Sequence, residues 1–448
     1  MAMAVRWKPE IVGELIGLVG EEQVRLDPDS REKLSRDYYW YSPVLIDLLK
    51  HKQADAIVIP TREDEIPSIL AAACRHRIPV TVRGGGTGNY GQAVPLFGGI
   101  VLDLSRLTDI VEVGDGYATV QCGARLKALE LELRKRNREL CVYPSTYAIA
   151  TVGGFVCGGS GGIGSITWGN LWDGNVLGAV IYTMEESPRR LEVAGDELRN
   201  YIHNYGTTGV MTRVTIRVAP KTDWFQAALQ FPDPESAMRF GEKLARDESI
   251  RKRLVSISEH PIPTWFIPIA KRFAPGAAVA LLEIEEGALE AVAATGAEFG
   301  GSVAHTIPAD RYQKTLGLSD FSWNHTTLWA LKSDPTITYL QAAFHETDYL
   351  EQMRRIKERF PDEVLFHFEW VRNGGVIAPS SLPIVRYRNK ERLYEIIRFF
   401  ESVGVRIFDP HTFVLDVGAR ADYAGMVRRK QMNDPFGLLN PGKIRMPG

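Results

Sequence analysis

The residues from Pro79 to Gln92, PVTVRGGGTGNYGQ, constrain the fold of this chain more than any other stretch. Five glycines fall within the eight residues 84–91, directly after a short β-branched run. Glycine has no Cβ atom, so its main chain can turn tightly and approach a ligand closely. Successive unobstructed N–H groups can also converge on the oxygens of a phosphate. The stretch therefore predicts either a phosphate-binding loop or a set of tight turns.

The neighbours of this loop exclude the common phosphate-binding motifs. Gly86, Gly88 and Gly91 satisfy G-x-G-x-x-G, but a Rossmann turn must open a helix that faces the pyrophosphate. Here Pro95 follows within a few residues, and GIVLDLS (99–105) is predicted to be a strand. The sequence has no Gly-Lys-Ser or Gly-Lys-Thr of a Walker A motif, and no V-A-I-K or H-R-D element of a protein kinase.

A second glycine-rich segment lies about sixty residues further along the chain. It spans Thr151–Asn170, TVGGFVCGGSGGIGSITWGN. Two such segments could form opposite walls of one anion-binding cradle, because each would present main-chain N–H groups. Tight turns remain the structural alternative for both.

The remaining sequence divides into two regions of different character. ADAIVIP (54–60), IPVTV (78–82), GIVLDLS (99–105), YATVQCG (117–123) and GVMTRVTIRVAP (209–220) are predicted strands, with few helices between them. Past residue 222 the glycine clusters stop, and strand-like runs alternate with helical ones such as DYLEQMRRIKERF. We predict an α+β fold with a first domain at 1–222 (core about 50–222), a second α+β domain at 223–404, and a C-terminal segment at 405–448 that packs on the first domain.

Composition excludes several classes of function. The 53 basic and 55 acidic residues nearly balance, so no concentrated basic surface for nucleic acid is expected. Four scattered cysteines form no C-x-x-C pair, and we interpret them as reduced core thiols. No apolar run is long enough for a membrane span and no cleavable leader is evident, so a cytoplasmic protein without a metal centre is expected. The oligomeric state, with a homodimer as one option, is left open.

The order of the motifs resembles one family. IVIPTREDEI, RGGGTGNYGQ, GIVLDLSRL, YPSTYAIATVGGFVCGGSGG, NYGTTGVMTRVTIRVAP and DPFGLLNPGK follow one another as in the FAD-linked oxidases of the vanillyl-alcohol oxidase or p-cresol methylhydroxylase (PCMH) type. The resemblance covers roughly residues 54–220 and the last fifteen. It implies a two-part PCMH-type FAD-binding domain, a separate α+β substrate (cap) domain, and a C-terminal tail that returns to the FAD domain.

The resemblance also implies which residues contact FAD. Those of the pyrophosphate loop would be Arg83, Gly84, Gly85, Gly86, Thr87, Gly88 and Asn89. Residues beside the flavin and the diphosphate would be Pro144, Ser145, Thr146, Thr151, Val152, Gly153, Gly154, Ser160, Gly161, Gly162 and Gly164. The adenosine half would meet Gly209, Val210 and Met211, and the tail would bring Asn440 and Lys443 near the flavin ring.

Two departures from the family predict noncovalent FAD. Members with covalently attached FAD usually place a histidine after the triple glycine, where this chain has Thr87. Doubly attached members add a cysteine before the Pro-Ser/Thr pair, where this chain has Tyr143; Cys141 is two positions too early. The expected cofactor is therefore FAD held without a covalent bond.

Candidate catalytic residues lie in the second domain and the tail. Histidine suits the base that takes the substrate proton, because its pKa lies near neutrality. In EVLFHFEWV, His367 and Glu369 would point to one face of a strand while Phe366, Phe368 and Trp370 pack on the other. His411 and His325 are further candidates, with His345 behind them. For each of them a hydrogen-bonded structural histidine is the alternative.

Arginines could recognise a substrate carboxylate. Arg372, Arg386 and Arg388 could each bind it in a bidentate manner, or could be ordinary surface residues. Relatives that oxidise 2-hydroxy acids commonly carry a His-Gly-Asp-Gly-Asn-type metal motif and a Glu-His-Gly motif, and this chain has neither. This absence argues against a metal-assisted reaction.

The resulting functional prediction is an FAD-dependent oxidase or dehydrogenase. It would transfer a hydride from a CH–OH carbon of a small hydroxy acid or alcohol to the flavin, with oxygen, a quinone or an electron carrier as acceptor. One alternative is oxidation of a phenolic or other aromatic side chain. Another is a noncatalytic FAD-binding subunit of an electron-transfer complex.

Overall fold

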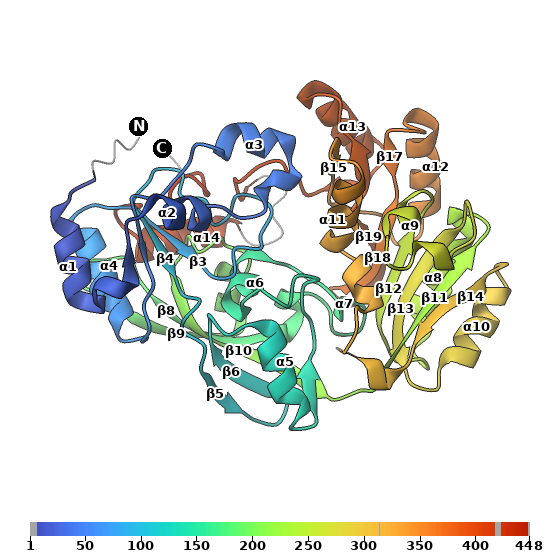
Figure 1. Cartoon of the computed structure of the whole chain (residues 1–448), viewed down its shortest axis with the longest axis horizontal. Coiled ribbons are helices and arrows are strands. Elements are labelled where there is room, and N and C mark those ends of the chain that lie inside the picture. Colours follow the sequence, from blue (N-terminus) through green and yellow to red (C-terminus); the bar gives the residue numbers. More distant parts are fainter. Residues whose placement is uncertain (1–6, 313, 417–422, 447–448) are drawn as a thin grey trace.

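The chain folds into two lobes that lie side by side (Figure 1). A computed structural model describes residues 7–312, 314–416 and 423–446. The first lobe holds the N-terminal elements together with the C-terminal helix, and we call it the FAD domain. The second lobe, which we call the cap domain, holds the elements between them. This is the predicted α+β arrangement.

A small sheet opens the FAD domain. The order of its strands is β1 (Val24–Arg25), β2 (Ala56–Val58), β4 (Ile100–Asp103) and β3 (Val80–Arg83). β2 and β3 both pair with β4 in parallel, because α4 (Glu65–Arg75) carries the chain from β2 back to the start of β3. The glycine loop after β3 therefore begins at the carboxyl end of this sheet.

Helices precede and cover the small sheet. They are α1 (Glu10–Val19), α2 (Pro28–Leu34) and α3 (Pro43–Leu49), and β1 lies between α1 and α2. The side chains of Asp27 and Ser42 cap α2 and α3 by accepting main-chain N–H groups, each directly before a proline. Ile11 and Leu15 of α1 are buried against α4.

A six-stranded antiparallel sheet forms the rest of the FAD domain. Its path is β5 (Ile110–Val113), β6 (Tyr117–Gln121), β10 (Val210–Pro220), β8 (Val176–Tyr182) and β9 (Arg190–Ala194), and β7 (Arg138–Leu140) pairs with the end of β10. α5 (Leu126–Arg134) packs on one face of this sheet. The second glycine segment contains α6 (Val152–Gly158) and the short α7 (Ser165–Trp168).

The cap domain is built on an eight-stranded antiparallel sheet. Its strands run in the order β14 (Ser302–Ile307), β11 (Trp224–Phe231), β13 (Ala278–Glu285), β12 (Lys252–Ser258), β18 (His367–Asn373), β19 (Val376–Ser381), β16 (Ala342–Ala343) and β21 (Arg406–Ile407). One face carries α8 (Pro234–Arg246), α10 (Leu289–Ala297), α12 (Tyr349–Arg359) and α13 (Lys390–Ser402). β21 extends this sheet to residue 407, past the domain boundary that is predicted at 404.

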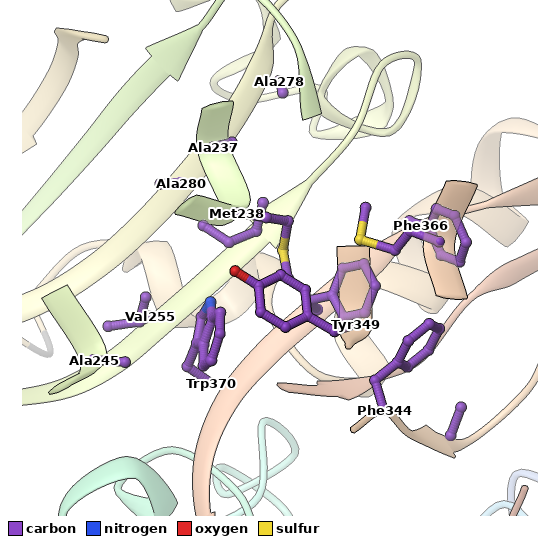
Figure 2. Close-up of a cluster of buried hydrophobic side chains, with 14 of the residues drawn as sticks. Ala237, Met238, Ala245, Val255, Ala278, Ala280, Phe344, Tyr349, Phe366 and Trp370 are labelled. Atoms are coloured by element: carbon purple, nitrogen blue, oxygen red, sulfur yellow. The ribbon is translucent and has the colours of Figure 1, made fainter. Parts of the chain in front are cut away.

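The aromatic side of β18 lies on the helix-covered face. Phe366 and Trp370 pack there with Phe344, Tyr349 and Met238, as Figure 2 shows. Trp370 meets the ring of Tyr349 edge-on, with 5.4 Å between ring centroids. This core confirms the predicted alternation and turns His367 and Glu369 toward the opposite face.

Two strand-like stretches of the cap domain are each split between two sheets. TITYLQAAFHE becomes β15 (Ile337–Tyr339) and β16, and EVLFHFEWV becomes β17 (Val364–Leu365) and β18. β15 and β17 pair with β20 (Ile384–Arg386) in a separate three-stranded sheet beside α9 (Ile262–Trp265) and α11 (Asn324–Ser333). Local hydrophobic patterns do not contain these breaks, because partner strands far along the chain decide them.

The C-terminal tail returns to the FAD domain, as predicted. α14 (Tyr423–Asn433) lies among the N-terminal elements (Figure 1). Leu439 forms a parallel bridge with Val80, and the N–H of Asn440 donates to the carbonyl of Val80 at 2.7 Å. The tail therefore braces the strand that leads into the glycine loop.

A buried ion cluster joins the two domains. Arg253 of β12 is fully buried, and its Nε donates to Glu283 at 2.7 Å. One of its guanidinium nitrogens also lies 3.8 Å from Glu139 of the FAD domain. Because a buried charge is costly unless it is paired, this cluster favours one orientation of the cap domain. None of the described helices is both long enough and apolar enough to cross a membrane.

Candidate functional site

One cavity of about 310 Å³ lies between the two domains. The FAD domain contributes the glycine wall, and the cap domain contributes the cap wall. The glycine wall consists of Asp37, Val82–Tyr90, Gln92, Ala93, Leu104, Cys122, Pro144–Thr146, Ala150, Thr151, Gly153–Phe155, Cys157–Gly161, Asn170, Trp172, Tyr205, Gly206, Gly209 and Met211. The cap wall consists of Trp323, Asn324, Gln341, Ala343, Val371, Asn373, Ala378–Leu382, Arg406 and Phe408.

The two glycine segments meet in the glycine wall. A Cβ atom on Gly85 would lie 2.4 Å from the carbonyl oxygen of Ile149, and one on Gly84 would lie 2.2 Å from Oγ1 of Thr151. Gly86 has a φ of +63°, which side chains rarely adopt. The two segments therefore pack main chain against main chain, as opposite walls of one cradle.

Polar groups in this wall suit an anionic ligand. Arg83 Nε and Asn89 Nδ2 are buried donors without a hydrogen-bond partner among the described residues. The Arg83 guanidinium donates to the carbonyl of Arg36 at 2.6 Å, while burial lowers the pKa of Arg83. Unmet donors and close-packed glycines fit the pyrophosphate of FAD, the group that the sequence motifs imply.

A carboxylate and an ammonium group brace the glycine loop from two sides. Asp37 accepts the N–H groups of Tyr39 at 3.0 Å and Ala93 at 3.2 Å, and Lys443 donates to the carbonyl of Gly91. Burial raises the pKa of Asp37 to about 6 and lowers the pKa of Lys443 to about 7. Each charge partly offsets the other's shift, so the two groups form one buried electrostatic unit.

Most of the predicted FAD contacts lie in the cavity wall. Arg83–Asn89, Pro144–Thr146, Thr151, Gly153, Gly154, Ser160, Gly161, Gly209 and Met211 all line it. The predicted contacts that do not line it are Val152, Gly162, Gly164, Val210, Asn440 and Lys443. Asn440 instead donates to the carbonyls of Gln92 and Tyr205, and Lys443 to that of Gly91, so both support the loop from behind.

A row of paired residues crosses the cap sheet above the cavity. Ser256, Glu369, Ser380, Ala343 and Arg406 stand directly opposite one another on successive strands. Opposed residues in an antiparallel sheet point to the same face. Ser380, Ala343 and Arg406 line the cavity, and so do Val371 and Asn373 on the same face of β18. The strand parity predicted for His367 and Glu369 therefore does select the face that carries the cap wall.

His367 and Glu369 nevertheless lie behind this wall. Both are buried, and His367 Nε2 donates to Glu369 Oε1 at 2.9 Å. Glu369 also accepts the hydroxyl of Ser256 at 3.0 Å and the main-chain N–H of Trp323 at 2.7 Å. Trp323 has a φ of +51°, an unusual value for a bulky side chain, and it lines the cavity. His367 and Glu369 therefore do not contact the cavity themselves; Glu369 holds the main chain of Trp323, which lines it.

The other predicted catalytic residues are also placed outside the cavity wall. His411 is buried, where it accepts from Ser42 Oγ at 2.7 Å and donates to the carbonyl of Tyr339 at 2.9 Å. Burial lowers the pKa of His411 to about 3 and that of His325 to about 4. Arg372 forms a surface ion pair with Glu248 at 2.6 Å. The structure thus brings His367 and Glu369 together and leaves the other three apart.

Several cavity residues carried no motif in the sequence. They come from single positions in distant segments: Asp37, Trp172, Trp323, Asn324, Gln341, Asn373, Arg406 and Phe408. The one sequence signal for any of these residues was the aromatic cluster DYYWYSP, which begins with Asp37.

Among the described residues, no cluster of three or more His, Cys, Asp or Glu side chains could hold a metal ion.

Two cysteines line the cavity as well. Burial raises the pKa of Cys157 to about 12 and the pKa of Cys122 well above its usual value. Both thiols stay protonated near neutral pH, which makes them poor nucleophiles. Cys141 is buried in the core beneath the glycine wall.

Comparison with known proteins agrees with this geometry. Residues 54–186 match the family model described as FAD binding domain. A D-lactate dehydrogenase of Archaeoglobus fulgidus is 30% identical over 220 residues, which cover 45% of this chain and 49% of that protein. The glycolate oxidase subunit GlcD of Bacillus subtilis is 30% identical over 178 residues, 38% of each chain. The chain thus spans half or less of the length of these relatives.

Solved structures share the whole fold at low sequence identity. An alkyldihydroxyacetonephosphate synthase superposes with a TM-score of 0.75 at 14% identity, covering 98% of this chain and 87% of that one. A 4-ethylphenol oxidase from Gulosibacter chungangensis gives 0.68 at 15% identity, covering 97% and 96%. Residues 54–186 thus match the FAD binding domain family, and the chain as a whole shares its fold with these two enzymes.

Proposed function

We propose that this protein is an FAD-dependent oxidoreductase that oxidises a CH–OH group of a small substrate. The observation that carries the proposal is the single cavity with two different walls. One wall is a main-chain cradle within the matched FAD binding domain, and the other is a set of side chains from the cap domain. A cofactor site that continues into a side-chain-lined space is the arrangement expected of a flavoenzyme.

The names of the relatives support a hydroxy acid or alcohol as substrate. D-lactate dehydrogenase and glycolate oxidase subunit GlcD both act, by their names, on hydroxy acids. Bound FAD supplies the hydride acceptor for such a reaction. The chain itself would bind and orient the substrate between the two walls of the cavity.

We propose that His367 and Glu369 position the cap wall. They hold the main chain of Trp323, and with it the start of α11, against the cavity. Two tyrosines line the cavity instead: Tyr90, whose hydroxyl oxygen accepts an N–H of Gln341, and Tyr205. These hydroxyls are candidates for holding the substrate oxygen.

We propose that FAD is held noncovalently. Thr87 lines the cavity, and its hydroxyl oxygen accepts from Thr146 Oγ1 at 3.4 Å. The two cavity cysteines have raised pKa values, and no described histidine lines the cavity. Acid precipitation should therefore release the yellow flavin into the supernatant. A yellow pellet would show a covalent bond.

One alternative is the oxidation of a phenolic side chain. The aromatic lining supports it, since Trp172, Trp323, Tyr90, Tyr205 and Phe408 all face the cavity. The second alternative is a noncatalytic FAD-binding subunit of a larger complex, which the name of GlcD as a subunit supports.

An anaerobic reduction screen tests these functions together. The FAD-loaded protein is mixed with 2-hydroxy acids, with neutral alcohols and with 4-alkylphenols, and the bleaching of the flavin is followed. Bleaching by CH–OH compounds is the expected result. Bleaching by alkylphenols alone would support the first alternative, and persistent failure with partner proteins co-purifying would support the second. Reoxidation with oxygen and with a quinone then identifies the acceptor.

A further inference from the structure

We propose that Asn440 is a positioning residue for the cofactor, because it ties three segments of the FAD domain to the C-terminal tail (residues 423–446). These segments are β3, the end of the glycine loop, and the stretch around Tyr205. Docking of the tail and binding of FAD then favour each other. The inference rests on the FAD binding of the proposed function and does not depend on the identity of the substrate.

The polar groups of Asn440 reach three different segments. The side chain is fully buried, and its Nδ2 donates to the carbonyl of Gln92 at 2.9 Å and to the carbonyl of Tyr205 at 2.6 Å. The main-chain N–H donates to the carbonyl of Val80 at 2.7 Å. One residue of the tail thus holds the strand before the glycine loop, the end of that loop, and the stretch around Tyr205.

Gln92 and Tyr205 carry this connection across the cavity wall to the second glycine segment. The Nε2 of Gln92 donates to the carbonyl of Gly158 at 2.7 Å. The main-chain N–H of Tyr205 donates to the carbonyl of Cys157 at 2.9 Å. All four of these residues line the cavity. Asn440 therefore holds, from behind, the two residues that connect to the end of α6.

The conformation of Asn440 matches this role. Its φ is +40°, a left-handed value that asparagine adopts more readily than most side chains. Removal of its amide would leave the carbonyls of Gln92 and Tyr205 without these donors, and a buried carbonyl without a donor is costly. Because both carbonyls belong to cavity-lining residues, the loss would change the cavity wall as well as the tail.

Asn440 acts on the cofactor through its neighbours. It does not line the cavity itself, whereas Gln92 and Tyr205 do. A wall that is already ordered binds a ligand more tightly than one that must be ordered by the ligand. Coupling of this kind is reciprocal: whatever tail docking adds to the affinity for FAD, bound FAD adds to the docking of the tail. The proposal can therefore be tested from either side.

Hydrogen exchange of the native protein tests the coupling without any substitution. Exchange of main-chain N–H groups is followed by mass spectrometry with saturating FAD and without FAD. We expect FAD to slow exchange at residues 438–440 at least about tenfold more than in α1. α1 is the matched reference, because it belongs to the same domain and contributes no residue to the cavity wall. Equal slowing in both segments would contradict the coupling.

Substitution of Asn440 tests the other side of the coupling. Asn440→Gly removes the amide and retains both the left-handed main chain and its bond to Val80. The dissociation constant of FAD, measured by fluorescence titration, should rise about tenfold to a hundredfold. Asn440→Asp keeps the shape but replaces the donor by an acceptor, so it should lose at least as much. Asn137→Gly is the matched control, since Asn137 has a φ of +55° but is exposed, and its affinity should stay within about twofold.

A second control separates positioning from a loss of stability alone. Ile396→Ala in α13 opens the core of the cap domain, so it should lower the melting temperature and leave the dissociation constant of FAD unchanged. If Asn440→Gly behaved in the same way, Asn440 would be a structural residue and the proposal would be wrong. If the Asn440 variants do not fold, the exchange measurement on the native protein decides alone.

A failure of this inference differs from a failure of the proposed function. Absence of FAD binding by the native protein would reject the proposed function. Binding of FAD by the native protein, with the same affinity in Asn440→Gly or with equal slowing of exchange in the tail and in α1, would reject only the role of Asn440.

Discussion

The glycine wall of the cavity is made largely of main chain, whereas the cap wall is made of side chains on a sheet. Gly84 and Gly85 of one segment contact Ile149 and Thr151 of the other with no room for a Cβ atom. Arg406 and Ser380, by contrast, reach the cavity from strands that are brought together only by pairing through β16.

This difference separates two kinds of specificity. A wall of main-chain N–H groups recognises what every FAD molecule has, namely phosphate oxygens and a flat ring. A wall of side chains can change one residue at a time without disturbing the fold, so it determines which substrate is accepted. Substitutions in the first wall should affect binding of the cofactor, and substitutions in the second should affect binding of the substrate.

The largest expected effect comes from filling the contact between the glycine segments. Gly85→Ala would place a methyl group 2.4 Å from the carbonyl oxygen of Ile149 and 3.2 Å from the Cα atom of Ala150. Main chain cannot yield as a flexible side chain can, so the two segments must separate at a cost of about 1–3 kcal/mol. The dissociation constant of FAD should rise by up to about a hundredfold.

A matched glycine shows whether this effect is specific to the wall. Gly17 in α1 has open space around its Cβ position and no positive φ, so Gly17→Ala should leave FAD affinity unchanged. Fluorescence titration gives the affinities, and circular dichroism shows whether both variants are folded. If Gly85→Ala bound FAD like the native protein, the glycine segments would not be the cradle.

A smaller effect is expected from Glu369 behind the cap wall. Glu369→Ala removes the acceptor for Trp323 N–H, Ser256 and His367, and it leaves buried donors unpaired. We expect a loss of about 1–3 kcal/mol in the free energy of unfolding. The shift of Trp323 should raise the KM for the substrate severalfold, with a smaller change in kcat and an unchanged dissociation constant for FAD.

The conservative variant separates positioning from proton transfer. Glu369→Gln retains an oxygen that can accept the Trp323 N–H, so it should restore most of the affinity for substrate. Reduction rates of both variants are measured across pH. If Glu369→Gln lowered the reduction rate as much as Glu369→Ala, and one of the two pH-dependent changes in that rate disappeared, His367 and Glu369 would take part in proton transfer. The cap wall would then do more than bind the substrate.

The same contrast explains what the sequence could reveal. Most predicted FAD contacts line the cavity. They could be predicted because a main-chain cradle requires glycine, and clusters of glycine can be recognised directly in the sequence. The parity of β18 was also readable, since aromatic residues alternate with His367 and Glu369. The covering of that pair by Trp323 was not readable, because it depends on where α11 starts relative to a strand more than forty residues away.

Arg406 illustrates the same limit. No sequence motif surrounds Arg406. The arginines that the sequence analysis named as candidates for binding a substrate carboxylate were Arg372, Arg386 and Arg388. Pairing with β16 brings Arg406 to the cavity, whereas Arg372 and Arg388 form ion pairs with Glu248 and Glu363 outside the cavity wall. Long-range register is set by the packing of the whole sheet, so no local pattern contains it.

The smallest expected effect concerns Asp37, a buried carboxylate in the glycine wall. Glu369 in the cap domain receives three hydrogen bonds, whereas Asp37 in the glycine wall receives two main-chain N–H groups at 3.0 and 3.2 Å. Burial raises the pKa of Asp37 to about 6 from 3.8. The folded protein therefore binds this proton more tightly than the unfolded chain does.

Linkage gives the direction of the resulting pH dependence. The stability associated with protonated Asp37 is fully present at low pH and is lost as the pH rises from about 4 to about 6. The melting temperature of the FAD-free native protein should therefore fall relative to that of Asp37→Asn across this interval. Asp115→Asn, at a position whose side chain is 95% exposed, should run parallel to the native protein. Parallel curves for Asp37→Asn as well would mean that burial does not raise the pKa of Asp37 in the folded protein, and the buried carboxylate of the glycine wall would then not destabilise it as the pH rises.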